Sequence, residues 1–117
     1  MPDNDAFRTL TPISLAILLA LLEEERHGYA LMKEVEARSE GRLRPGTGTL
    51  YAAVQRMMEE GLVAQSAREP GPAEDARRRY YGITAAGRSA AESEVARLAR
   101  LVEWAEPRLA GDPGASR

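Results

Sequence analysis

The apolar run from Ile13 to Leu22 restricts the fold of this 117-residue chain more than any other feature. Thr11 followed by Pro12 predicts the N-cap and first turn of a helix, and only Ser14 is polar within the run. A helix that is apolar on every side has to be covered on every side. It is therefore either a central core helix or a helix with one face against a partner subunit. We expect the partner, because a domain of this size has few elements with which to surround a helix.

Several classes of protein are disfavoured by composition. The apolar run is too short to span a bilayer, and the N-terminus MPDNDAFR is unlike a secretory signal. The chain has no cysteine, and His27 is its only histidine, which argues against disulfides, thiolate or histidine metal sites and a histidine-dependent triad. The acid pair Glu74-Asp75 is interpreted as a solvated loop tip. We expect a soluble, cytoplasmic protein that is not an enzyme and that uses no metal and no cofactor.

Four further elements follow the first helix. Residues 27–41 predict a second helix that ends at Gly41, and residues 44–62 predict a third that ends at Gly61, since glycine often follows the last helical turn. Residues 62–68 and 77–84 alternate like strands around the loop EPGPAEDA, which predicts a β-hairpin. A last helix begins near Thr84, and its regular part is expected to end at about Pro107, because proline disrupts a helix interior.

Charge is distributed unevenly along the chain. Residues 1–37 have a net charge of −4 and residues 89–117 a net charge of −1, whereas residues 38–88 contain nine arginines and six acids, a net charge of +3. A local basic region indicates an anionic partner more reliably than the total charge of −2. The positive region contains the third helix and the hairpin.

The start of the third helix, GTGTLYAAVQR, suits contact with DNA. A helix N-terminus presents unpaired N–H groups and a positive dipole end to a phosphate. Thr47 and Thr49 can bond phosphates or base edges, and small residues after them allow Gln55 and Arg56 to approach adenine and guanine. A nucleotide-binding loop is disfavoured, since the segment lacks both the P-loop and the dinucleotide spacing. A capped helix that binds nothing is the remaining alternative.

Three helices, a hairpin and a long final helix is the element order of a winged helix-turn-helix, in which the third helix enters the major groove. The predicted fold is mainly α with a small β-hairpin. Residues 1–83 form the DNA-binding domain, residues 84–109 a dimerisation helix, and residues 110–117 a disordered tail. The arginines of the hairpin are expected to meet phosphates, although strand alternation prevents all three from doing so equally. The predicted DNA-binding residues are Tyr29, Thr47, Thr49, Tyr51, Gln55, Arg56, Arg77, Arg78 and Arg79.

A heptad seam runs along the last helix. Apolar residues recur there at spacings of four and three, which is the pattern of helices that pack side by side. The seam is short for a free coiled coil but long enough to pack on another helix. Together with the first helix it predicts a homodimer. The predicted dimerisation residues are Ile17, Leu21, Ala91, Val95, Leu98, Val102 and Ala105.

The sequence resembles the PadR family of bacterial transcriptional regulators. The segments HGYALMKEVEARSEG, GTLYAAVQRMMEEGLV and RRRYYGITAAG carry the resemblance, which extends over about residues 10–100. The short length and single last helix are similar to the compact subgroup of the family. Ala52 and Met57 depart from the family pattern, which often has proline and leucine there. Leu98 occupies the position at which some compact members carry an aromatic residue. The positions that match the family motifs are Gly28, Tyr29, Thr49, Leu50, Tyr51, Arg56, Gly61, Leu62, Tyr81, Thr84 and Gly87.

The resemblance implies a homodimeric repressor that binds an inverted-repeat operator in double-stranded DNA. It also implies release of the DNA by a small apolar or aromatic effector or by a stress signal. A winged-helix module that docks other proteins remains the alternative.

Overall fold

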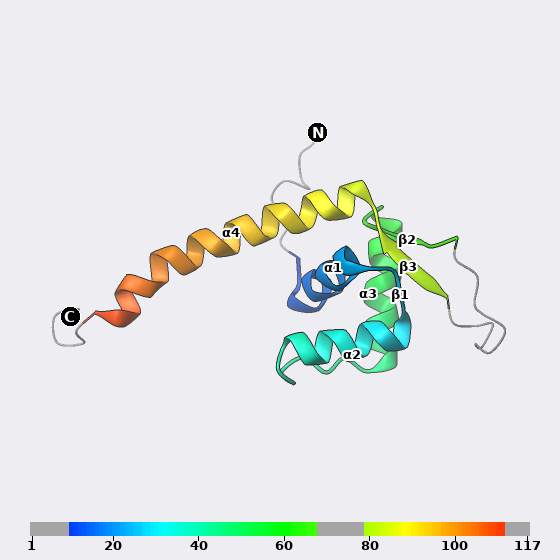
Figure 1. Cartoon of the computed structure of the whole chain (residues 1–117), viewed down its shortest axis with the longest axis horizontal. Coiled ribbons are helices and arrows are strands. Elements are labelled where there is room, and N and C mark those ends of the chain that lie inside the picture. Colours follow the sequence, from blue (N-terminus) through cyan, green and yellow to red (C-terminus); the bar gives the residue numbers. More distant parts are fainter. Residues whose placement is uncertain (1–9, 68–78, 112–117) are drawn as a thin grey trace.

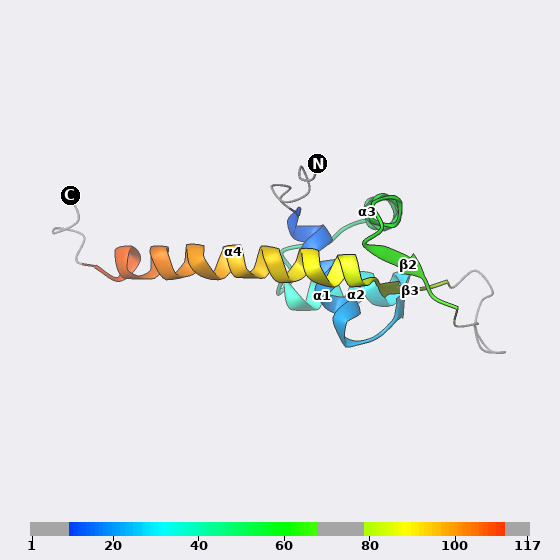
Figure 2. The same cartoon turned by 90° about the horizontal axis from the view of Figure 1, so that it is seen from above.

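The computed structural model describes residues 10–67 and 79–111. Within these ranges, helices α1, α2 and α3 and a small sheet form a compact head, and α4 extends away from it as a long arm (Figures 1 and 2). The elements are α1 (Pro12–Glu23), β1 (Arg26–His27), α2 (Gly28–Arg38), α3 (Thr47–Glu59), β2 (Val63–Gln65), β3 (Tyr80–Ile83) and α4 (Ala85–Ala110).

Helix α1 forms the centre of the head. Thr11 caps it as predicted, since its Oγ1 accepts a hydrogen bond from the amide of Ser14, and Pro12 begins the first turn. Ile17, Leu18 and Leu21 are buried, and α1 contacts α2, α3, α4 and β3 of its own chain. These four elements cover much of the helix, but Leu19 remains 38% exposed, so one side is still open and a partner on that side stays a prediction.

Arg26 joins the end of α1 to α2. Only 12% of its side chain is exposed, and its Nε donates to the carbonyl oxygen of Ala20 at 3.0 Å. Its guanidinium lies 2.7 Å from a carboxylate oxygen of Glu23 and 3.8 Å from one of Glu34. A shielded arginine with several acceptors fixes a helix end more firmly than an exposed ion pair does.

The sheet has three strands rather than the predicted two. The strand order is β1-β3-β2, and both pairs are antiparallel. In β1, Arg26 pairs with Tyr81 and His27 with Tyr80. A strand of two residues is too short to show alternation, so the sequence pattern did not reveal it. His27 also caps α2, as its Nδ1 accepts from the amide of Ala30.

Two helix ends differ from the predictions. Helix α2 ends at Arg38 rather than at Gly41, and Gly41, with a φ of +81°, lies in the turn that follows. Helix α4 continues past Pro107 to Ala110. Proline removes one amide donor from the helix. Only one turn of α4 follows Pro107, so this single lost hydrogen bond lies close to the end of the helix and does not stop it. Thr84 caps α4 as predicted, and its Oγ1 accepts from the amide of Gly87 at 3.0 Å.

Candidate nucleic-acid interface

Helix α3 has one buried and one exposed face. Leu50, Val54 and Met57 of the predicted apolar stripe are buried in the core. The opposite face is open, and five of the predicted DNA-binding residues lie on it in exposed positions. These are Thr47, Thr49, Tyr51, Gln55 and Arg56.

The N-terminus of α3 is suited to an anion. Its N-cap is Gly46, which has no side chain with which to cover the amides of the first turn. The helix contains no acid before Glu59, so no carboxylate opposes the positive end of its dipole. An added Cβ at Gly48 would meet nothing within 4 Å, which leaves the backbone of this turn accessible to a bulky polyanion.

The N-terminus of α2 lies beside Tyr51 of α3. The Tyr51 ring packs against Gly28, the first residue of α2. Tyr29 follows Gly28, has an exposed ring, and lies 5.8 Å from the Nζ of Lys33. The ammonium of Lys33 thus adds a positive charge beside Tyr29, although Glu36 shares it at 3.8 Å.

The turn between α2 and α3 contributes two arginines that the sequence prediction did not include. Arg42 and Arg44 are exposed in this turn, within the five residues before α3. The Nε of Arg44 lies 3.3 Å from a carboxylate oxygen of Glu36 and donates to the carbonyl oxygen of Gly41. The signal in the sequence was their place directly before the helix, in the region of positive charge.

The base of the wing lies beside α3. Arg79 precedes β3 and is exposed, whereas Arg77 and Arg78 lie outside the described residues. The pKa of Tyr81 is raised, first by its burial and then by the nearby Tyr51, while Arg79 lowers it. Strand β2 contacts α3 and pairs with β3, so the base of the wing lies next to this helix.

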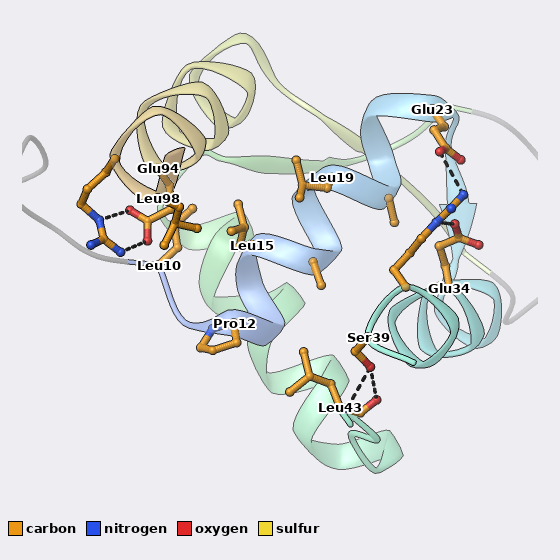
Figure 3. A pocket seen from close by; sticks show the side chains of 14 residues that line it. Leu10, Pro12, Leu15, Leu19, Glu23, Glu34, Ser39, Leu43, Glu94 and Leu98 are labelled. Atoms are coloured by element: carbon orange, nitrogen blue, oxygen red, sulfur yellow. Dashed lines mark hydrogen bonds and ion pairs between the residues drawn. The ribbon is translucent and has the colours of Figure 1, made fainter. Parts of the chain in front are cut away.

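A second surface is an apolar groove of about 700 Å³ between α1, α2 and α4. Leu15 and Leu19 of α1 and Leu98 of α4 project into it (Figure 3). At its rim, Arg97 donates two hydrogen bonds to Glu94, the shorter at 2.7 Å, and this bonding lowers the pKa of Glu94. Apolar side chains thus line much of the groove, and charged side chains lie at its rim.

The structure divides the predicted dimerisation residues. Ile17, Leu21 and Ala91 are buried by their own chain, so they support the helices and do not present a surface to a partner. Their prediction as contact residues is corrected, because an apolar residue at seam spacing can equally face the core of its own domain. Val95 and Val102 are exposed, Leu98 lines the groove, and Ala105 is half-buried. Leu101 and Trp104 add exposed apolar area beside the seam.

In the two described ranges, no cluster of three or more His, Cys, Asp or Glu side chains is arranged to hold a metal ion. No helix within those same ranges is long and apolar enough to cross a membrane.

The fold consists of three packed helices, of which the third has an exposed face, and an antiparallel wing. This arrangement defines a winged helix-turn-helix protein, here with a long C-terminal helix. Residues 17–93 match the transcriptional regulator PadR-like family. The match extends over more than half of the chain, and the protein belongs to this family. It is a PadR-like transcriptional regulator, which places it among DNA-binding proteins and not among enzymes.

The chain is also similar to individual proteins. The chain is 33% identical over 91 residues to the uncharacterized protein X of Lysinibacillus sphaericus, a match that covers 77% of this chain and 75% of the relative. It is 36% identical over 101 residues to an uncharacterized 37.1 kDa protein in transposon TN4556 of Streptomyces fradiae; this covers 86% of the chain but 25% of that longer relative. A PadR-like transcriptional regulator from Bacillus cereus shares the fold, with a TM-score of 0.73, 22% identity and coverage of 86% and 93% of the two chains.

Proposed function

We propose that this protein is a homodimeric repressor that binds an inverted-repeat operator through the exposed face of α3. The observation that carries the proposal is the acid-free start of α3, whose first turn is exposed and has no side-chain cap. We expect Thr47 and Thr49 to contact phosphates, and Gln55 and Arg56, about two turns further along the exposed face, to contact base edges. An exposed face of this composition on the third helix is what the winged-helix mode of binding requires.

The proposed dimer is supported by the part of α4 that its own chain leaves uncovered. Gly87, Ala91 and Glu94 are its buried residues within the described chain, and all lie in its first ten residues. Val95, Leu101 and Val102 remain exposed, each at 43% or more. Apolar area on this scale usually marks an interaction site. A second copy is the occupant that fits, because its own seam supplies matching leucine and valine and because family members typically act as dimers.

Repression is the effect that we propose for such binding, because a dimer held on DNA by two copies of α3 would occupy its site and exclude other proteins from that stretch of DNA. Two recognition helices related by a two-fold axis would contact half-sites about 10 base pairs apart, centre to centre. A small apolar effector is proposed to act in the groove beside Leu15 and Leu98, because a compound bound among these side chains would compete with the partner helix.

The test is selection of DNA from a pool of random duplexes by the purified protein, followed by affinity measurements on the recovered consensus. We expect the wild-type protein to recover a two-fold consensus. Arg56→Ala should relax base preference at one position in each half-site, by about 1–3 kcal/mol if the contact is a bidentate pair with guanine. Its melting temperature should stay near that of the wild type, because the Arg56 side chain is exposed.

If Arg56→Ala recovers the same consensus with the same discrimination, Arg56 does not contact bases. If the wild-type protein recovers no consensus at all, α3 does not recognise sequence, and a protein-docking module becomes the better proposal.

Arg79 should contribute affinity that is independent of sequence. Arg79→Ala is expected to weaken binding to consensus and scrambled duplexes by the same factor. It should also reduce the slope of log K against log salt by about one unit, the value for one lost phosphate contact. Binding isotherms over a series of salt concentrations measure the slope. An unchanged slope would place the base of the wing away from the DNA.

A further inference from the structure

Gly28 leaves a space that the ring of Tyr51 fills. A Cβ atom built on Gly28 would overlap the hydroxyl oxygen and the Cζ of Tyr51 and would lie 2.9 Å from its Cε1. Carbon atoms in good contact are separated by about 3.5–4.0 Å. The ring can therefore occupy this place only because residue 28 has no side chain.

The backbone itself does not require glycine at this position. Among the described glycines, Gly41 and Gly61 have positive φ angles, and Gly28 does not. Helix propensity would even favour alanine, since glycine in a helix costs up to about 1 kcal/mol relative to alanine. Glycine is needed at the start of α2 because a side chain there would collide with Tyr51 of α3.

Tyr51 is held on one side and open on the other. The residue is 42% exposed, and it lies on the face of α3 proposed to meet DNA. Its hydroxyl oxygen and Cζ are the atoms nearest to the place that a Gly28 side chain would take, so the far end of the ring lies against the first residue of α2.

We propose that Gly28 is a positioning residue for DNA binding, because its missing side chain lets the hydroxyl end of the Tyr51 ring lie against the first residue of α2 and so fixes the place at which Tyr51 would contact DNA. This inference rests on the proposed function, in which Tyr51 contacts DNA. An added methyl group would displace the far end of one partly exposed side chain and not the backbone. Gly28→Ala should therefore impair DNA binding while the protein still folds.

The test is a double-mutant cycle on Gly28→Ala and Tyr51→Ala, with the consensus duplex selected by the wild-type protein as the probe. We expect Gly28→Ala alone to weaken binding about fivefold, the share of one hydrogen bond. In the Tyr51→Ala background the same change should have no further effect, since the residue that it displaces is gone. Gly82→Ala is the matched control, because its methyl group would lie at an ordinary 3.5 Å from Glu25.

A second measurement does not depend on DNA. In protein labelled with ¹³C at the tyrosine rings, Gly28→Ala should shift the Tyr51 signal and leave that of Tyr29 nearly unchanged. An unshifted Tyr51 signal, equal losses of affinity in both backgrounds, or a Gly28→Ala protein that does not fold would each overturn the role given to Gly28. Failure of the wild-type protein to select any consensus would instead refute the proposed function itself.

Discussion

Val95→Glu combined with Val102→Glu should convert the protein from a dimer to a monomer. Both side chains are exposed on the seam of α4, at 43% and 51%, so the change leaves the core of the single chain intact. In a dimer it would bury four carboxylates in an apolar contact, which costs several kcal/mol for each unpaired charge. Loss of the second recognition helix should weaken binding to a two-fold consensus by about a hundredfold or more. Sedimentation and binding isotherms measure the two effects.

The control places the same residue on the opposite side of the helix. Ser93→Glu combined with Arg100→Glu changes two exposed positions that are seven residues apart, as Val95 and Val102 are. This protein should stay dimeric even though its change in charge is larger. A wild-type protein that sediments as a monomer at micromolar concentration would remove the dimer from the proposal, and so would a seam variant that stays dimeric.

Gly87→Ala should destabilise the fold severely. A Cβ at Gly87 would overlap the carbonyl oxygen of Leu62 and would lie 2.9 Å from the Cγ1 of Ile83. The obstacle here is backbone, which cannot swing away, and the same carbonyl accepts the amide of Thr84 at 3.1 Å. We expect a loss of about 3 kcal/mol, the upper end of the usual range for overpacking, and a fall in melting temperature of roughly 10–20 °C.

Thermal unfolding followed by circular dichroism measures this loss. Gly48→Ala is the control, since its methyl group would meet nothing within 4 Å and helix propensity favours alanine. It should melt at or above the wild-type temperature. If Gly87→Ala melts with the control, α4 is not held at Leu62 in the way that the structure describes.

The helices were predictable because each has its own local signals. Thr11 and Thr84 cap α1 and α4 as expected, and the apolar stripe of α3 is buried. The errors have a shared cause. Strand β1 is too short for a pattern, and its existence depends on β3, more than fifty residues later in the chain. How much of α1 is covered by its own chain likewise depends on elements distant in the sequence, so the apolar composition of α1 alone could not predict it.

The exposed face of α3 was also predictable, since it is what the apolar stripe leaves open. The slot beneath Tyr51 was not, because it depends on the distance between two helices at one point. The error in predicting three of the dimerisation residues has the same cause. Ile17 and Ala91 lie on apolar faces like those of their neighbours, and only the packed structure shows that their own chain covers them.

The junction between β3 and α4 has a mechanical consequence. Thr84 is the single residue between them, and it is fixed by its hydroxyl on the carbonyl oxygen of Gly61 and by its amide on that of Leu62. The arm, about 39 Å long for its 26 residues, therefore meets the wing without a hinge. In the dimer proposed above, a tilt imposed at the far end of α4 should therefore reach the wing as a rotation of the whole head. A signal that changes how the two α4 helices cross would then change the distance between the two copies of α3 without deforming either head.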